Sequence, residues 1–444
     1  MAFENIAAAK DLKNDEFYTQ LVDIQLELNN YSDKFKDKIV FCNCDDPFES
    51  NFVKYFLMNF NRLELKELIA TGYKTSPFGG TELGEQNNPY TLRVKDTKKY
   101  LVGTQKDLDV AGAKYFLESE GSRIMTPLIG NEALDENGKQ IYCTVKEFIT
   151  DDEGNEVLDK NGKSKRKNVK KELYYEAGDF RSDMCLALLK ESDIVVTNPP
   201  FSLFREFLTT LMKYEKQFLI IGNINCITYK EVFPLLKENK IWLGNGMGRK
   251  ISGFIVPEYY GLYGTEASIN KRGQRIVATN NALWLTNLDH AKRHQMLPLD
   301  LGFTYRDHED MYPTYDNYKA INVDKTNQIP CDYTGIMGVP ITFLDVFCPE
   351  QFKIIGLSSK DGSTEVPRFH DNEYYNGYTR GKVVTGMESN MPILNVKGKG
   401  GTLCQKEGCI DLFQLYWRIF IKYTDTYIKS HPERFNTKED DING

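Results

Sequence analysis

The sequence predicts an α/β protein with a doubly wound open sheet, followed by a second domain of mixed α+β structure. Three observations indicate this class. Buried-strand runs alternate with amphipathic helix patterns up to about residue 290, a polar segment with hairpin turns interrupts that alternation, and short strands with aromatic clusters replace it after about Asp289. Strand–helix–strand units of this length form parallel sheets. A chain of 444 residues is long enough for two or three such domains.

The strands of the predicted sheet are short apolar runs that end in polar residues. They are residues 38–44, 65–71, 193–197, 217–222, 241–243 and 282–285, and the doubly wound pattern resumes at 173–180 after its interruption. Each predicted helix follows a residue whose side-chain oxygen suits an N-cap. These residues are Thr19, Ser50, Ser182 and Ser202. The sequence therefore predicts which helix connects each pair of strands.

The interrupting segment, residues 76–172, is predicted to be a polar β-hairpin insertion on the sheet. Its turn signals are Asn137-Gly138 and Asn161-Gly162, because Asn-Gly supplies the positive φ of tight hairpin turns. A basic run occupies residues 163–167. Such a run is either a solvated face or a contact with a duplex backbone, and the sequence leaves both open.

Composition restricts the environment and the partners. The formal net charge of −7 excludes a global basic field for indiscriminate polyanion binding, so any nucleic-acid contact has to be local. No run approaches the length of a membrane span, and the first residues lack a signal-peptide pattern. Nine cysteines form an odd number without regular spacing, which favours reduced thiols. We expect a cytoplasmic protein with no membrane partner and no metal site.

The most informative motif is Asn198-Pro199-Pro200-Phe201, which follows the strand at 193–197. Two prolines remove two N–H donors and hold the backbone extended, so a free carbonyl stands beside the Asn198 side chain. This pair of acceptors suits an exocyclic amino group, which carries two N–H donors. The alternative is a strand end closed by a Pro-Pro turn, with Phe201 in the core.

Polar residues at other strand ends suggest a cofactor site, since ligands of open α/β sheets bind at the carboxyl ends of the strands. Asp45, Asp46, Thr71 and Asp179 lie at such positions. The first strand lacks the Gly-rich turn that cradles a pyrophosphate, and an acidic turn repels phosphate, so a cationic cofactor such as S-adenosylmethionine fits better. The alternatives are an Asx turn at Asp45 and Asp46 and a helix N-terminal acid at Asp179.

The order of these motifs resembles the EcoRI-type adenine-specific (N6) DNA methyltransferases. The likeness is carried by Asp-Glu-Phe-Tyr-Thr at 15–19, Phe-Cys-Asn-Cys-Asp-Asp-Pro at 41–47, Gly-Asp-Phe at 178–180, Asn-Pro-Pro-Phe at 198–201 and Gly-Ile-Met-Gly-Val-Pro-Ile-Thr-Phe-Leu at 335–344. It covers about residues 13–425. It implies a Rossmann-like methyltransferase domain at 12–290, carrying the insertion 76–172, and a target-recognition domain at 291–444.

The resemblance implies transfer of a methyl group from S-adenosylmethionine to N6 of a flipped-out adenine in double-stranded DNA. The catalytic residues it implies are Asn198, Pro199, Pro200 and Phe201. The cofactor-binding residues it implies are Phe17, Tyr18, Thr19, Asn43, Cys44, Asp45, Asp46, Pro47, Thr71, Asp179, Phe180 and Asn198. Residues 17–19 would close over the methionine end, residues 43–47 would line the floor, and residues 179–180 would hold the adenine of the cofactor.

Sequence recognition is predicted in loops that mix basic and aromatic residues. The candidate DNA-binding residues are Arg249, Lys250, Arg272, Arg275, Arg368 and Arg380. The alternative for each region is a solvated surface loop.

Two rival functions stay open at the level of sequence. One is a methyltransferase for another planar amino group, an RNA base or a protein glutamine, although such relatives more often carry Tyr at the fourth motif position. The other is a catalytically silent DNA-binding relative, which the intact Tyr18, Asp179 and Asn198 disfavour. For an active enzyme we expect a monomer, with a cognate restriction endonuclease as a candidate partner.

Overall fold

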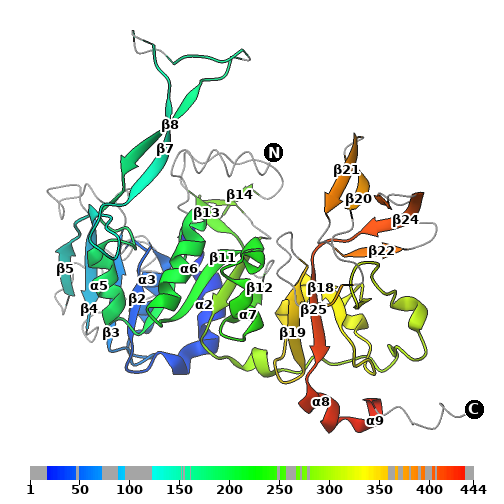
Figure 1. Ribbon diagram of the computed structural model, residues 1–444. Coiled ribbons are helices and arrows are strands. Elements are labelled where there is room, and N and C mark those ends of the chain that lie inside the picture. The colour runs from blue at the N-terminus through cyan, green and yellow to red at the C-terminus, as the bar shows by residue number, and fades with distance from the viewer. Residues whose placement is uncertain are drawn as a thin grey trace, which may run out of the picture. The chain divides into compact units, whose positions relative to one another are not determined.

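The computed structural model is of mixed α/β class with a multi-strand mixed sheet (Figure 1). It describes residues 18–46, 50–72, 89–95, 123–151, 153, 156–160, 162–247, 251–256, 267–270, 273–277, 281–358, 366–368, 374–379, 382–388, 392–395, 403–405 and 408–435. The chain forms two compact units. The first comprises Met1–Ile221 and Ser252–Ala278, and the second comprises Gly222–Ile251 and Thr279–Gly444.

A mixed sheet forms the core of the first unit, in the order β11-β10-β2-β3-β4-β5. Its strands are β2 (Ile39–Cys42), β3 (Glu67–Thr71), β4 (Tyr90–Val94), β5 (Arg123–Pro127), β10 (Ile194–Thr197) and β11 (Gln217–Asn223). β10 runs parallel to β2 and β11, and β2 runs parallel to β3. Val40, Leu68 and Val195 are fully buried, as expected where helices cover both faces of a parallel sheet. The runs predicted at 38–44, 65–71, 193–197 and 217–222 are thus confirmed as strands.

The helices of this unit carry the predicted apolar stripes. They are α2 (Leu21–Leu28), α3 (Asn51–Asn59), α5 (Asp183–Glu191) and α6 (Phe204–Lys213). Ser50 and Ser182 are N-caps as predicted, since their hydroxyl oxygens accept from the backbone N–H of Phe52 at 3.0 Å and of Cys185 at 3.4 Å. These caps satisfy donors that the first helical turn leaves open.

Two predicted caps are wrong. Thr19 lies in β1 (Tyr18–Thr19) and pairs with Phe254 of β13 (Phe254–Val256), so its extended backbone leaves Gln20 as the N-cap of α2. Ser202 lies inside a 3₁₀ turn, Phe201–Leu203, which precedes α6. The turn is closed by the Leu203 N–H donating to the Pro200 carbonyl at 3.0 Å. In both places tertiary pairing and the proline backbone override the local preference for a side-chain cap.

A small antiparallel sheet also belongs to the first unit, with the order β1-β13-β15-β14. Its remaining strands are β14 (Ala267–Ile269) and β15 (Arg275–Val277). Sequence patterns did not predict this sheet, because its strands are too short for an alternation to be recognised.

The segment 76–172 contributes more than a hairpin. β4 and β5 extend the mixed sheet antiparallel to β3, while β6 (Asn131–Glu132) pairs with β9 (Tyr174–Tyr175). Residues 173–180 therefore do not add a strand to the mixed sheet, contrary to the predicted resumption of the doubly wound pattern. The predicted hairpin is present: β7 (Tyr142–Phe148) pairs antiparallel with β8 (Arg166–Glu172), and this ribbon projects from the sheet (Figure 1). Gly138 and Gly162 have φ of +74° and +76°, as the turns require.

The second unit begins with the two strands predicted at 241–243 and 282–285. These are β12 (Trp242–Met247) and β16 (Ala282–Thr286), which pair antiparallel, with α7 (Phe233–Lys237) preceding them. One further sheet has the order β17-β18-β25-β19, with bounds Ile321–Asn322, Met337–Pro340, Arg418–Tyr423 and Phe352–Leu357. Another has the order β21-β20-β23-β24-β22, with bounds Lys382–Glu388, Tyr374–Thr379, Leu403–Gln405, Gly408–Gln414 and Ile393–Asn395. The short helices α8 (Asp425–Ser430) and α9 (Pro432–Phe435) follow β25.

Among the described helices, none has the length and apolarity needed to cross a membrane. All seven cysteines whose state is described have free thiols.

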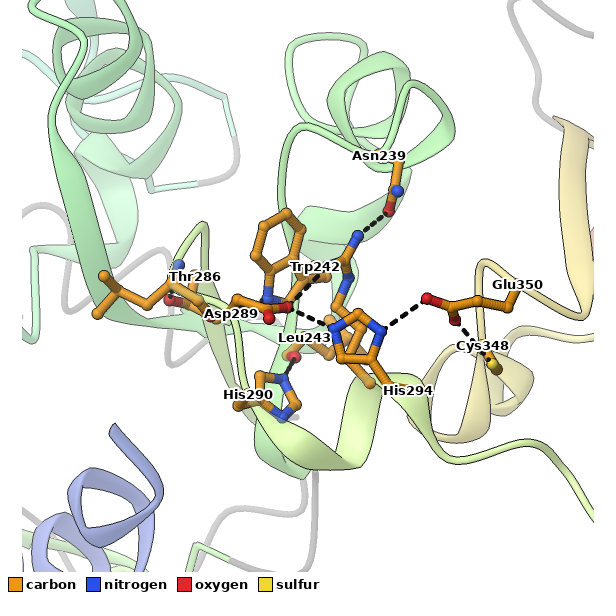
Figure 2. A network of polar contacts seen from close by, with 11 residues as sticks. Asn239, Trp242, Leu243, Thr286, Asp289, His290, His294, Cys348 and Glu350 are labelled. Atoms are coloured by element: carbon orange, nitrogen blue, oxygen red, sulfur yellow. Dashed lines mark hydrogen bonds and ion pairs between the residues drawn. The ribbon is translucent and has the colours of Figure 1, made fainter. Parts of the chain in front are cut away.

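A polar network inside the second unit joins the segment after β16 to the segment before β19 (Figure 2). His294 lies between two carboxylates: its Nδ1 is 2.7 Å from Glu350 and its Nε2 is 2.8 Å from Asp289. Arg293 donates to Asp289 at 2.8 Å, and its guanidinium lies 3.8 Å from the centroid of the Trp242 ring. A protonated imidazole satisfies both carboxylates, so the network depends on the charge of His294.

The pKa values of the network follow from these contacts. Hydrogen bonds with Glu350 and then Asp289 raise the pKa of His294. Burial acts to raise the pKa of both carboxyl groups, but the hydrogen bonds from His294 and its neighbours outweigh it and lower the pKa of Asp289 and of Glu350. The stabilisation from His294 is therefore complete below its unfolded pKa and is lost as pH rises through the raised pKa. The stabilisation contributed by Asp289 and Glu350, whose pKa values are lowered, is lost as the pH falls through those lowered values.

Replacing His294 by Gln should lower the thermal midpoint by about 1–2 °C near pH 6, because a part-exposed ion pair is screened by solvent and contributes little. The difference from the unmodified protein should shrink as the pH rises through the raised pKa of His294, because the imidazole then loses its charge. Differential scanning calorimetry at several pH values measures this. His308→Gln, at an exposed position, is the matched control. A difference that is constant with pH would contradict the role given to the charge.

Candidate active site

The Asp45 carboxylate ties the carboxyl end of β2 to the carboxyl end of β10. The Ser50 hydroxyl donates to Asp45 Oδ1 at 2.6 Å, and the Thr197 hydroxyl donates to Asp45 Oδ2 at 2.5 Å. Because Ser50 also caps α3, one carboxylate fixes two strand ends and a helix start. The bracket formed by Asp45, Ser50 and Thr197 places the turn at 43–46 beside Asn198, the residue that follows Thr197.

Burial dominates the electrostatics of this bracket. Asp45 is 7% exposed, and desolvation raises its pKa to about 7, although the hydrogen bonds from Ser50 and Thr197 act in the opposite direction. The negative charge of Asp46 raises it further. Both hydrogen bonds are stronger to an ionised than to a protonated carboxyl group, so the strength of the bracket is linked to pH near neutrality.

The motif at 198–201 emerges from this bracket. Pro199 is buried, and Asn198 and Phe201 are half-buried. The Phe201 ring meets the Phe254 ring edge-to-face with centroids 6.1 Å apart. Phe254 in turn pairs through its backbone with Thr19. The predicted catalytic aromatic and the predicted lid segment are therefore joined through one residue of β13.

The segment at 18–19 is also tied to α3. Asn51 Nδ2 donates to the Thr19 carbonyl at 2.8 Å. The Thr19 hydroxyl is buried and has no hydrogen-bond partner among the described residues. Buried hydroxyls are normally satisfied, so this orphaned donor and acceptor is suited to a polar ligand.

Asp179 is held by Arg181 in a two-pronged contact. Arg181 Nε donates to Oδ1 at 2.9 Å and Arg181 Nη2 donates to Oδ2 at 2.7 Å. Arg181 Nη1 also donates to Glu206 of α6 at 3.0 Å. The loop reaches this geometry through Gly178, whose φ is +80°. Oδ1 also accepts from the Arg181 backbone N–H at 2.9 Å. Oδ2 accepts from Nη2 and keeps a second lone pair, so it can accept from a ligand while Arg181 fixes the orientation of the carboxylate.

The other predicted site residues have varied surroundings. Phe180 is buried, with its ring centroid 5.0 Å from that of Phe207. Thr71 and Asn43 are buried, Asp46 is 8% exposed, and Cys44 is half-buried with a thiol pKa raised by burial.

The predicted DNA contacts fall on different elements. Arg275 is half-buried on β15, in the same small sheet as Tyr18. Arg368 donates to the Tyr318 hydroxyl at 3.2 Å and covers that ring. Phe17, Pro47, Arg249, Lys250, Arg272 and Arg380 lie outside the described residues.

Sequence reasoning missed the residues that support this site. Thr197 is the one polar residue in the otherwise apolar strand Ile-Val-Val-Thr, which was an available signal. Arg181 stands two residues after Asp179, a spacing that permits the observed fork. Ser50 was predicted as a cap, but the hydrogen bond that its hydroxyl donates to Asp45 could not be predicted from the local sequence pattern.

A pair of acceptors on a proline-held turn, beside the acidic turn that follows β2, is the arrangement expected of an enzyme that methylates an amino group. The family described as adenine-specific methyltransferase EcoRI matches residues 5–423. The chain is 47% identical over 357 residues to the type II methyltransferase M.EcoRI of Escherichia coli, covering 80% of this chain and 90% of that protein. It is 32% identical over 394 residues to the type II methyltransferase M.MpnI of Mycoplasma pneumoniae, covering 88% and 93%.

A third relative is the type II methyltransferase M.MgeORF184P of Mycoplasma genitalium, 32% identical over 350 residues, which are 78% of this chain and 84% of that protein. No solved structure matches the chain. The chain belongs to the EcoRI family of adenine-specific DNA methyltransferases. The resemblance read from the motifs is thereby confirmed.

Replacing Thr197 by Val should lower the rate of methyl transfer about 10–100-fold, because the turn that carries Asn198 loses its link to Asp45 and small displacements at a reacting centre are costly. Losing one donor raises the pKa of Asp45 further, so the defect should be larger at about pH 6.5 than at about pH 8.5. Single-turnover methylation measures the rate. Thr209→Val, an exposed substitution on α6, is the control. If Thr197→Val and Thr209→Val had the same rate and the same pH dependence, the contact between Thr197 and Asp45 would have no role in catalysis.

Proposed function

We propose that this protein transfers the methyl group of S-adenosylmethionine to N6 of a flipped-out adenine at a specific site in double-stranded DNA. The observation that carries the proposal is the Asp45 bracket, which holds the acidic turn at 43–46 beside the Asn-Pro-Pro-Phe motif. A donor pocket and an acceptor for the target amino group are thus neighbours. Family membership supports the adenine specificity.

The residues present fit a cationic cofactor. Asp46, in the turn after β2, and Asp179, in the loop before α5, are carboxylates that are each 8% exposed, and the orphaned Thr19 hydroxyl offers a further polar contact. When bound, S-adenosylmethionine supplies an electrophilic methyl group on a positively charged sulfur. We assign residues 17–19 to the methionine end, residues 43–47 and Thr71 to the floor, and Asp179 with Phe180 to the adenine of the cofactor.

The motif residues act on the target base. The Asn198 side-chain oxygen and the Pro199 carbonyl accept the two N–H groups of adenine N6. Their pull favours a pyramidal nitrogen, whose lone pair would form the new N–C bond as the sulfur–methyl bond breaks. A neutral thioether would leave, and the extra proton on the methylated nitrogen would pass to solvent. The base has to leave the duplex to reach them, and Phe201 provides a face that replaces the lost stacking. Positioning dominates this chemistry.

Recognition is assigned to two regions. The domain at 291–444, with Arg368 and Arg380, and the loops with Arg249, Lys250, Arg272 and Arg275, would read the target sequence. The methyltransferase domain would occupy 12–290 as a Rossmann-like doubly wound sheet. The relatives named type II methyltransferases support a restriction–modification role in the cytoplasm, with a cognate endonuclease as partner and a monomer acting on DNA. Long-read sequencing of DNA from cells expressing the protein tests the function and reports the motif.

Replacing Asn198 by Ala should abolish N6 methylation while cofactor affinity stays within a few-fold. Loss of one positioned hydrogen-bonding group typically costs about 10²–10³ in rate, and here the reacting nitrogen is misplaced as well. Asn198→Gln keeps the amide but moves it by one methylene, so it should also be strongly impaired. Tritium transfer to DNA and calorimetric cofactor titration give the two quantities. Turnover near that of the unmodified protein would overturn the mechanism.

Replacing Phe201 by Ala should weaken the flipped-base complex more than non-specific DNA binding, because stacking on one base contributes about 1–3 kcal/mol. A fluorescent base analogue at the target position reports the extruded base. Phe201→Tyr keeps the ring and should keep the signal. If the Ala variant flips the base as well as the unmodified protein does, Phe201 is a packing partner of Phe254 alone.

A further inference from the structure

The β7–β8 ribbon has two faces of different composition. Side chains alternate between the faces of a strand, and the pairing aligns Phe148 with Arg166 and Thr144 with Lys170. One face, called here the cationic face, is defined by Tyr142, Thr144, Lys146, Phe148, Arg166, Asn168, Lys170 and Glu172. All these residues are exposed. The opposite face carries Cys143, Val145, Glu147, Lys167, Val169 and Lys171.

Two aromatic rings organise the cations of the cationic face. The Arg166 guanidinium lies 4.4 Å from the centroid of the Phe148 ring, and Lys170 Nζ lies 4.6 Å from the centroid of the Tyr142 ring. The rings are 42% and 45% exposed. Cations held over aromatic faces lose less side-chain freedom when they bind an anion.

The charge balance differs between the faces. On the cationic face, Lys146, Arg166 and Lys170 stand against one carboxylate, Glu172. On the opposite face, Lys167 and Lys171 lie with one carboxylate, Glu147, which pairs with Lys171 at 2.6 Å. The cationic face therefore has the larger excess of positive charge. The exposed carboxylates Asp151, Glu153 and Glu156 lie beyond the paired strands, towards the tip.

The spacing of the cations suits a regular polyanion. Arg166 and Lys170 are four residues apart on one strand, which corresponds to about 13 Å at the rise of a β-strand. Phosphates of one DNA strand recur about every 3.4 Å along the helix axis. The cationic face therefore spans several phosphates, and its two aromatic-held cations can each contact one.

We propose that the cationic face of the β7–β8 ribbon binds the sugar–phosphate backbone of duplex DNA, independently of sequence. The inference rests on the proposed function, in which duplex DNA is the substrate. The ribbon adds affinity and leaves base recognition to other residues. Backbone contacts of this kind release counterions and make binding salt-dependent.

The test compares two double variants of the full-length protein that remove the same charge from the same strand. Arg166→Gln/Lys170→Gln changes the cationic face, and Lys167→Gln/Lys171→Gln changes the opposite face. Binding to a labelled mixed-sequence duplex of about 30 base pairs is measured by anisotropy over a range of salt concentrations. The first variant should reduce the slope of log affinity against log salt by roughly 1.8 and weaken binding about ten-fold at low salt. The second variant should change neither the slope nor the affinity at low salt.

A charge-conserving variant, Arg166→Lys/Lys170→Arg, separates charge from folding of the ribbon and should keep the slope. In methylation assays, the first double variant should raise KM for DNA and leave kcat unchanged. Equal losses in both Gln variants, or no loss in either, would overturn the proposal. An altered methylated motif would indicate base reading and would also overturn it. If the wild-type protein binds DNA without methylating adenine, the proposed function is wrong, but the two Gln variants still test whether the cationic face binds the DNA backbone.

Discussion

One buried carboxylate, that of Asp45, is the constraint on which the arrangement of the site depends. A carboxylate removed from water is costly unless its oxygens are hydrogen-bonded, and here each oxygen has one hydroxyl donor, Ser50 or Thr197. Removing either donor leaves a buried acceptor unsatisfied, which typically costs about 1–3 kcal/mol. The interaction contributes more than stability, because its partners stand at the start of α3 and immediately before Asn198. The acidic turn at 43–46 and the turn that begins at Asn198 are therefore fixed relative to each other.

A second link connects the two sides of the site through α6. Arg181 fixes the Asp179 carboxylate and also reaches Glu206, which lies in the first turn of α6. That helix continues directly from the turn containing Phe201, and its buried Phe207 packs against Phe180. Two contacts of different kinds thus couple the turn containing Phe201 to the loop containing Asp179. An ion pair alone would be screened by solvent, while the ring contact is insensitive to salt.

The sequence was most informative where local chemistry decides the structure. The apolar runs that became β2, β3, β10 and β11 and the caps Ser50 and Ser182 were all predictable, because burial and orphan helix donors act within a few residues. The failures have a common cause in long-range pairing. Thr19 pairs with Phe254 of β13, 235 residues away in the sequence, and Asn131 of β6 pairs with Tyr175 of β9, 44 residues away. The Asp45–Thr197 contact spans 152 residues, so no pattern of neighbours could have assigned Thr197 its role.

Charge is distributed in this chain so that two opposite requirements coexist. Acidic turns suit a positively charged cofactor but repel a phosphate backbone, and the formal net charge is −7. Screening limits such repulsion to about 8–10 Å at physiological ionic strength. The paired part of the β7–β8 ribbon is seven residues long, which corresponds to about 23 Å. Arg166, at the outer end of the paired strands, is therefore more than one screening length from any carboxylate at the base of the ribbon. The tip beyond Arg166 carries Asp151, Glu153 and Glu156. The positive charge of the cationic face is thus confined to the paired strands, away from the acidic turns of the sheet.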